Sequence, residues 1–201
     1  DASMRTLFPL AILSALAGAP AFAQDTTNRA SAVFAGGCFW CVEEAFDPVP
    51  GVVATTSGYT GGTVENPTYE QVSGGGTGHY EAVKVEYDPA KVTYEQLLDV
   101  FWKNVDPFDP NGQFCDKGDS YLSAVFVAGD EEKRLAEASK TAVAARFDEP
   151  VATAILPEQA FYPAEDYHQD FYKKSSARYK YYKWGCGRVQ RLEEIWGKPA
   201  A

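Results

Sequence analysis

The sequence predicts an α+β fold of two layers, with elements in the order β-α-β-β-α-β, then an additional helix and strand and an irregular C-terminal tail. Two observations support this fold. Strand-like and helix-like segments alternate along most of the chain, and two consecutive strand candidates lie between the first two helix candidates. No internal repeat or low-complexity linker divides the sequence, so we expect a single domain over residues 31–201.

The first half of this domain supplies three strands and one helix. Residues 31–35, SAVFA, resemble a short buried strand, and a glycine pair then turns the chain. Residues 38–46 have helix-like spacing, and the sequence DPVPG at 47–51 ends that helix. The next strand starts at Val52 and runs into a glycine turn, and residues 81–87 alternate as a strand does.

The second half begins with an amphipathic helix, for which Thr93 is the expected N-cap. A long polar loop at 106–120 follows, and loops of this length often carry function. Residues 121–128 are expected to form a strand. The clearest helix of the chain opens at Asp130 and runs to residue 147.

The chain then continues with a last expected strand at 151–157. From Ala164 onward the sequence is aromatic and basic, and it breaks at WGCGR, residues 184–188. We expect this tail to be irregular.

The N-terminus resembles a secretory signal peptide over residues 1–23. Arg5 supplies a positive charge, residues 7–18 are mostly apolar, and Ala-Phe-Ala at 21–23 forms a small-x-small cleavage site. A membrane anchor is the alternative, but it requires a run of about 20 apolar residues. We therefore expect a secreted or periplasmic protein with a polar leader at 24–30. Residues 1–3 precede Met4 and do not enter the fold prediction.

The net charge of the chain limits the classes of partner that it can bind. The formal net charge is −10 and the pI is about 4.7, whereas nucleic-acid binding requires a basic face. An anionic membrane surface is unfavourable for the same reason, and after the first 23 residues no apolar run is long enough to span a bilayer. We expect no nucleic acid partner, no stable membrane association and a monomer.

The four cysteines, Cys38, Cys41, Cys115 and Cys186, admit several interpretations. Two structural disulfides would have three possible connectivities. However, domains that depend on disulfides generally lack a core, and this chain is 45% hydrophobic. A zinc site is disfavoured because Cys115 and Cys186 lack a second CxxC spacing, so we predict no metal. A thioredoxin-like CxxC normally lacks two bulky aromatic residues between its cysteines.

Cys38 is the candidate nucleophile. It would lie at the first turn of a helix after a strand and a glycine pair, where free N–H groups and the helix dipole favour a thiolate. Phe39 and Trp40 beside it offer apolar surface for a small apolar group. The alternative is an inert, buried cysteine on a core helix.

Several segments together resemble the peptide methionine sulfoxide reductase A family. They lie in one colinear order over residues 33–188 and read GGCFWCVEEAFDPVPGV, TSGYTGG, NPTYEQV, TGHYEAVKVEYDP, LLDVFW and RYKYYKWGCGR. The resemblance implies a ferredoxin-like two-layer α/β sandwich. It also implies reduction of the S epimer of methionine sulfoxide, free or in proteins, by thiols and without a cofactor.

The same resemblance implies roles for individual residues. The nucleophile is Cys38, the carboxylic acid is Glu81, and Cys186 is a C-terminal recycling cysteine. The remaining matches are polar residues of the site and the aromatic wall for the substrate methyl group: Tyr59, Asp116, Tyr121, Phe39 and Trp40.

These residue types suit the chemistry. A sulfoxide is polarised as S⁺–O⁻, so a thiolate can attack sulfur only while the oxygen gains a proton. A glutamic acid buried near aromatic rings has a raised pKa and can supply that proton, and phenols can donate hydrogen bonds to the oxygen. The products are methionine and a sulfenic acid on Cys38, which condenses with a thiol.

The identity of that second thiol is left open by the pattern. We expect Cys186 first, because glycines on both sides near the chain end would let it swing. Cys41 is the alternative, and Cys115 is either the third candidate or a later partner of Cys186. An exported enzyme would need a thioredoxin-like reductant outside the cytosol.

Some residues depart from the family pattern. Cys41 and Cys115 stand where many relatives have glycine and asparagine, and Leu122 and Tyr80 also differ. Two rival functions therefore remain: an exported dithiol–disulfide oxidoreductase using Cys38 and Cys41, and a binding domain with two plain disulfides.

Overall fold

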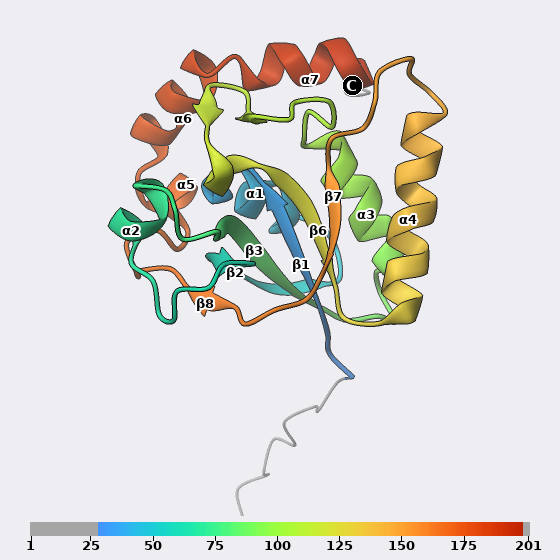
Figure 1. Cartoon of the computed structure of the whole chain (residues 1–201), viewed down its shortest axis with the longest axis horizontal. Helices are drawn as coiled ribbons and strands as arrows, with labels where there is room; N and C mark the ends of the chain where they lie inside the picture. The colour runs from blue at the N-terminus through green and yellow to red at the C-terminus, as the bar shows by residue number, and fades with distance from the viewer. Residues whose placement is uncertain (1–27, 199–201) are drawn as a thin grey trace, which may run out of the picture.

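The computed structural model describes residues 28–198, which contain a six-stranded sheet in the order β7-β6-β1-β3-β2-β8 (Figure 1). The expected signal peptide, and the first four residues of the expected leader, lie outside the described residues. All neighbouring strands are antiparallel except β6 and β7. The strands are β1 Ala30–Gly36, β2 Val52–Thr60, β3 Tyr80–Tyr87, β6 Ser123–Val127, β7 Ala154–Pro157 and β8 Tyr162–Pro163.

The topology confirms the predicted two-layer fold. With α1 (Phe39–Phe46) and α3 (Tyr94–Lys103), strands β1, β2, β3 and β6 follow in the order β-α-β-β-α-β. Strand β3 lies between β1 and β2, and β6 flanks β1, which is the ferredoxin-like arrangement. Helix α4 (Asp130–Ala144) then connects β6 to the parallel strand β7, so the additional helix and strand are also present.

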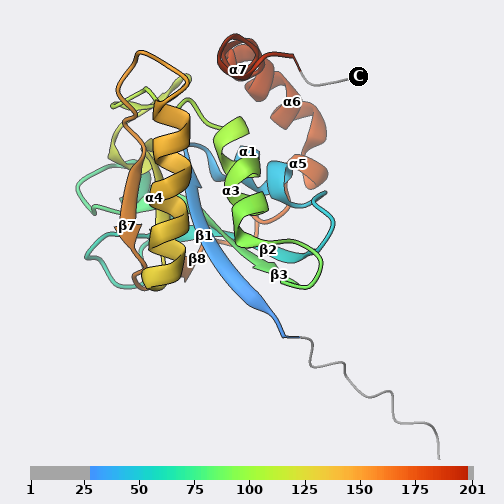
Figure 2. The same cartoon turned by 90° about the vertical axis from the view of Figure 1, so that its right-hand side faces the viewer.

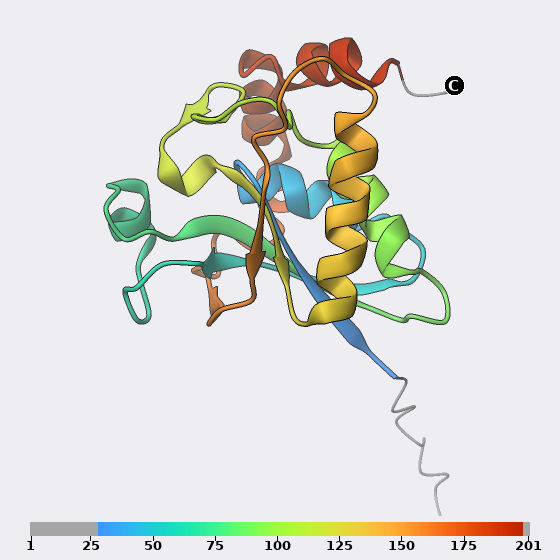
Figure 3. The same ribbon diagram turned by 45° about the vertical axis from the view of Figure 1, so that its right-hand side comes forward.

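Helices α1, α3 and α4 pack with one face of the sheet to form the main core, and α3 and α4 lie side by side (Figures 2 and 3). Phe34 of β1 is fully buried there, with its ring 4.9 Å from that of Phe46 and 5.4 Å from that of Phe101. Its neighbours Val33 and Ala35 belong to a second, smaller cluster. Burying each such aromatic side chain contributes about 1.5–3 kcal/mol, which fixes the position of β1 and the turn that follows it.

Capping boxes begin two helices, of which one was predicted. Thr93 accepts a hydrogen bond from the N–H of Gln96 and begins α3, as predicted. The same capping box at Thr68 begins α2 (Tyr69–Ser73), a short helix that the sequence analysis missed.

The long loop at 106–120 contains a small hairpin of β4 (Gly112–Gln113) and β5 (Asp116–Lys117). A 3₁₀ turn, η1 (Asp119–Tyr121), follows it. Strand β6 therefore begins at Ser123, two residues later than predicted, because the N–H of Tyr121 bonds back to Gly118.

The prediction of an irregular tail was wrong for residues 171–196. They form α5 (Phe171–Lys174), α6 (Ser176–Gly185) and α7 (Arg188–Trp196), which lie along the upper side of the molecule in Figure 1. Helix α6 has only Tyr179 buried, so it lacks the apolar periodicity that reveals a helix. Gly187, with φ of +67°, makes the break between α6 and α7. Within residues 28–198, no helix is both long and apolar enough to cross a membrane.

Candidate active site

The bend between β1 and α1 fixes the position of Cys38. Gly37 has φ of +77°, and a Cβ on it would lie 2.5 Å from the Cβ of Gln113. Gln113 is fully buried and bonds through its amide to the backbone N–H and carbonyl of Asp106. The glycine pair is therefore required for close approach of the loop, and Cys38 becomes the N-cap residue of α1.

A small cavity of about 60 Å³ lies at this bend. Six of the residues predicted for the site line it, together with two tyrosines whose roles were not predicted. The predicted residues are Cys38, Phe39, Trp40, Glu81, Asp116 and Tyr121, and the two additions are Tyr69 and Tyr182. Both additions lie in the motifs NPTYEQV and RYKYYKWGCGR, so the sequence signal existed but did not assign them to the cavity.

Glu81 lies near the start of β3 and is 2% exposed. Burial raises the pKa of its carboxyl to about 8; the N–H of Phe39 opposes this shift, and the charges on Asp116 and Cys41 add to it. The side chain therefore carries a proton at neutral pH, as expected of a buried acid. Its alternating strand could equally have placed it in solvent, and the structure rules that out.

Cys38 and Cys41 are both free and buried, and their surroundings shift their pKa values in opposite directions. Burial raises the pKa of Cys38, and the hydrogen bond with Cys41 and the charge of Cys41 add to that effect. Glu81 also accepts the N–H of Phe39 at the helix start, so this donor is not directed at the Cys38 sulfur. Burial therefore opposes the thiolate that the helix start was expected to favour at Cys38.

The surroundings of Cys41 favour its anionic form. A hydrogen bond from Cys38 lowers the pKa of Cys41 to about 6, against the opposing effect of burial. The positive charges of Arg188 and Lys183 act in the same direction, as does the hydroxyl of Tyr179, which donates to the sulfur at 3.4 Å. The two neighbouring thiols therefore titrate as a pair, in which Cys38 is the hydrogen-bond donor to Cys41.

Asp116 and three tyrosines form the polar side of the cavity. The hydroxyl of Tyr182 donates to Asp116 and also forms a hydrogen bond with Cys38. Tyr121 and Tyr69 share a hydrogen bond between their hydroxyls. Burial raises the pKa of all three tyrosines, so their hydroxyls stay protonated and can donate.

Tyr59 does not line the cavity, although it was predicted for the site. It lies on β2 opposite Glu81 and is fully buried, and its hydroxyl donates to Glu165 at 2.8 Å. The same carboxylate accepts the N–H of Tyr69 at 2.8 Å. Tyr59 therefore acts on the cavity through Glu165, which holds the start of α2.

Phe39 and Trp40 form an aromatic wall that is fixed from behind. The ring of Trp40 stacks on Phe171 with centroids 3.9 Å apart, and its Nε1–H donates to Nδ1 of His168 at 3.1 Å. The ring of Phe39 lies 4.9 Å from that of His168. Because these contacts hold both rings in place, the wall is suited to bind a small apolar group.

Cys115 and Cys186 are joined by a disulfide, with Cα atoms 4.9 Å apart. Both sulfurs and a carboxylate oxygen of Asp116 lie within 4.8 Å of one another, so the disulfide adjoins the cavity through Asp116. Cys115 is exposed to solvent. The pair fits the expectation that Cys115 is a later partner of Cys186.

The sequence is similar to characterised reductases along nearly its whole described length. A family profile described as "Peptide methionine sulfoxide reductase" matches residues 30–200. "Peptide methionine sulfoxide reductase MsrA" of Bacillus subtilis is 51% identical over 168 residues, which cover 83% of this chain and 95% of the relative. "Peptide methionine sulfoxide reductase MsrA 2" of Caulobacter vibrioides is 50% identical over 192 residues, covering 95% and 96%.

Solved structures of methionine sulfoxide reductases are also similar to this chain. Methionine sulfoxide reductase A of Corynebacterium diphtheriae has a TM-score of 0.68 and 33% identity, over 74% of this chain and 76% of that one. The reduced form of Mxr1 from Saccharomyces cerevisiae has a TM-score of 0.71 and 30% identity, over 76% and 88%. Mxr1 in complex with Trx2 is 23% identical with a TM-score of 0.52, over 73% and 87%, and supports the fold alone.

Proposed function

Since the chain belongs to the peptide methionine sulfoxide reductase family, we propose that its cavity is where a thiol of the protein reduces methionine sulfoxide. The enzyme is an oxidoreductase that reduces methionine sulfoxide at the expense of thiols. The observation that carries the assignment of the site is the joint lining of one small cavity by Cys38, protonated Glu81 and the aromatic wall. The rival dithiol–disulfide oxidoreductase finds no support in these relatives.

Substrate binding uses the two sides of the cavity. We assign the methyl group of the sulfoxide to the wall of Phe39 and Trp40 and its oxygen to the side of Glu81 and Tyr121. An oxygen placed there meets a carboxylic acid and a hydroxyl, both of which can donate a hydrogen bond. Tyr182 lies between Cys38 and Asp116 and can donate to the same region.

The chemical step requires Cys38 to lose its proton and the oxygen to gain one. Cys38 attacks the sulfoxide sulfur while its proton passes to Cys41, with which it already shares a hydrogen bond. Glu81 gives its proton to the oxygen, and the S–O bond and the transient bond between the two sulfurs both break as the hydroxyl group transfers to Cys38. The net products are methionine and a Cys38 sulfenic acid, and the proton held by Cys41 returns to Glu81.

Conversion of the Cys38 sulfenic acid to a disulfide consumes a second thiol. We propose that reduced Cys186 attacks the Cys38 sulfenic acid, releases water and forms a Cys38–Cys186 disulfide. Cys115 then attacks Cys186, which frees Cys38 and leaves the Cys115–Cys186 disulfide. Two observations support this order: that disulfide adjoins the cavity, and the backbone at Gly187 permits a sharp turn beside Cys186.

The physiological reductant would then act on the exposed Cys115 side. We propose a thioredoxin-like protein; the relative Mxr1 has been solved in complex with Trx2. We also propose an exported, monomeric enzyme, on the basis of the signal-peptide pattern at 1–23. N-terminal sequencing of the protein from a periplasmic fraction tests export: a chain that starts near Gln24 supports it, and a chain found only in the cytosol opposes it.

The decisive assay is reduction of racemic dabsyl-methionine sulfoxide with dithiothreitol, resolved by chiral chromatography. We expect the S epimer to disappear and the R epimer to remain. A Cys38→Ser variant is the control and should consume neither. Equal loss of both epimers would contradict the stereochemistry, and no loss of either would contradict the proposed site and function.

A further inference from the structure

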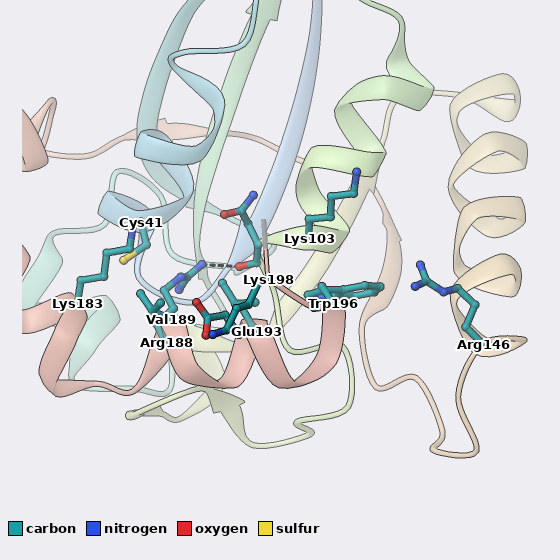
Figure 4. A pocket seen from close by; sticks show the side chains of 12 residues that line it. Cys41, Lys103, Arg146, Lys183, Arg188, Val189, Glu193, Trp196 and Lys198 are labelled. Carbon is teal, nitrogen blue, oxygen red and sulfur yellow. Dashed lines mark hydrogen bonds between the residues drawn. The ribbon is translucent and has the colours of Figure 1, made fainter. Parts of the chain in front are cut away.

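A second and larger cavity, of about 620 Å³, lies between the end of α3 and helices α6 and α7 (Figure 4). Its size is within the range of about 300–1,000 Å³ typical of small-molecule sites. Five of its 12 lining residues are Lys or Arg, against 18 of 201 in the whole chain. An acidic protein thus concentrates positive charge in one concave place, where it favours an anionic ligand.

These cations differ in how they are held. Arg188 is 3% exposed; its guanidinium donates to the carbonyl of Asn104 at 2.6 Å and lies 4.5 Å from the ring centroid of Phe114. Lys183 pairs with Glu44. The other three, Lys103, Arg146 and Lys198, form no ion pair within residues 28–198, and Glu193 is the one acidic residue of the lining.

The thiol of Cys41 is at one end of this cavity. Figure 4 shows Cys41 beside Lys183 and Arg188, with Trp196 and Arg146 toward the other end. Cys38 lines the small cavity and not the large one, and for Cys41 the reverse holds. The two sulfurs of the CxxC pair therefore separate a substrate cavity from a basic cavity. Attack on a disulfide comes in line with the S–S bond, so a thiol in the basic cavity would approach Cys41.

We propose that the basic cavity binds a small thiol that carries carboxylates, and that this thiol reduces a Cys38–Cys41 disulfide by attack on Cys41. The inference rests on the proposed function, because methionine sulfoxide is the oxidant that creates the disulfide. It applies when Cys186 is already bonded to Cys115, as in this structure, and has no thiol to offer. Cys41 then becomes the thiol that resolves the Cys38 sulfenic acid.

The steps balance. The Cys41 thiol condenses with the Cys38 sulfenic acid, forming the S–S bond and releasing one water. A first small thiolate attacks Cys41, breaks that bond and leaves Cys38 as a thiolate, which takes up a proton. A second small thiolate attacks the mixed disulfide and releases Cys41 and a small disulfide. Two thiols are oxidised for each sulfoxide reduced to methionine.

The test isolates the Cys41 route in a Cys115→Ser/Cys186→Ser enzyme and uses glutathione as the carboxylate-bearing probe. In that background, Lys103→Glu/Lys198→Glu reverses two unpaired charges of the cavity, and Lys174→Glu/Lys180→Glu is a matched double reversal on the exposed parts of α5 and α6 outside it. Loss of two weak ion pairs of this kind together lowers the binding of the charged thiol, and so its rate, by about tenfold. We expect the rate with glutathione, divided by that with neutral dithiothreitol, to fall about tenfold in the cavity variant and to stay unchanged in the control.

A second arm needs no variant. Glutathione and its dimethyl ester are compared on wild-type enzyme oxidised by substrate, and the protein–glutathione disulfide is mapped by mass spectrometry after acid quench. We expect preferential attachment at Cys41 with the free acid, weakened by high salt. Equal reaction of acid and ester at Cys41, or attachment only at Cys115 or Cys186, would overturn the proposal. Turnover with dithiothreitol but a charge-independent glutathione rate defeats this inference alone, whereas no turnover of the wild-type enzyme with either thiol defeats the proposed function.

Discussion

Glu81 accepts a hydrogen bond from the backbone N–H of Phe39, the residue that directly follows Cys38, at 3.1 Å. This contact joins the acid on β3 to the first turn of α1, so acid and nucleophile keep one relative position. It also directs the helix-start donor to the carboxyl group instead of the sulfur.

Replacing Glu81 by Gln should lower kcat for sulfoxide reduction by about 10²–10⁴, the usual contribution of a general acid. The amide keeps the size of the side chain and an oxygen to accept the N–H of Phe39, so the fold should persist. Glu86→Gln, on the same strand but away from the cavity, is the control and should keep wild-type activity. Wild-type kcat in Glu81→Gln would show that another group supplies the proton.

The pH dependence of the wild-type enzyme should show the same acid. Burial raises the pKa of Glu81 to about 8, so the acid form predominates at neutral pH and is lost as the pH rises through that value. The rate of Cys38 oxidation in a single turnover should therefore fall above about pH 8. In Glu81→Gln this fall should disappear from the remaining rate. A rate that rises steadily through pH 9 in the wild type would contradict Glu81 as the donor.

The raised pKa of Glu81 also makes the free energy of unfolding depend on pH. Between the ordinary carboxyl pKa of about 4.5 and the folded value near 8, the folded protein holds a proton that the unfolded chain has lost. The contribution of Glu81 to the free energy of unfolding thus decreases as the pH rises from 5 to 8. Urea unfolding at several pH values should show a weaker loss over this range in Glu81→Gln than in the wild type. Equal slopes in both proteins would mean that the carboxyl is not buried as described.

Removing Cys115 should trap the first disulfide of the relay. If Cys186 resolves the sulfenic acid, reduced Cys115→Ser enzyme given one equivalent of substrate without reductant should accumulate a Cys38–Cys186 linked peptide. The wild type under the same conditions should instead show Cys115–Cys186 linkage, because Cys115 completes the exchange. Peptide mapping after acid quench distinguishes the two. Prompt formation of Cys38–Cys41 in the variant would assign resolution to Cys41 in the fully reduced enzyme as well.

Tyr59 and Tyr121 should differ in what their hydroxyls do. Tyr121 lines the cavity, so Tyr121→Phe should reduce kcat strongly, by up to the 10²–10³ seen when an oxyanion donor is removed. Tyr59→Phe removes a bond to Glu165 outside the cavity and should cost about 1 kcal/mol of stability, with a smaller effect on kcat. Thermal melts and steady-state kinetics on both variants measure this contrast. A larger loss of kcat for Tyr59→Phe would place its hydroxyl at the substrate.

Much of the fold was predictable because local signals agreed with one another. Thr93 and Gln96 both mark the start of α3, and the glycine pair before Cys38 fits a bend that only a residue without Cβ can make against Gln113. The failures lie where stability comes from distant contacts. Helix α7 is held by Trp196, whose Nε1–H donates to the carbonyl of Val105, a contact between segments 91 residues apart. Sequence periodicity carries no information about such a contact.

The residues of the candidate site were also predictable only in part. The resemblance to a family brought together six of the eight cavity residues, whereas spacing alone gave no reason to bury Glu81 or to join Asp116 to Tyr182. The lowered pKa of Cys41 was beyond sequence reasoning. It depends on Arg188 and Lys183, which approach Cys41 from helices that were not expected to exist.

The separation of the four cysteines into two pairs sets the reducing capacity of each molecule. Cys38 and Cys41 form one pair, and Cys115 and Cys186 form the other, so a fully reduced chain stores four electrons. It can therefore repair two methionine side chains before any donor arrives, the second only after Cys38 has been freed from the first. An enzyme that meets oxidants in bursts, with reductant delivered slowly, gains a reserve of one full turnover from this pairing.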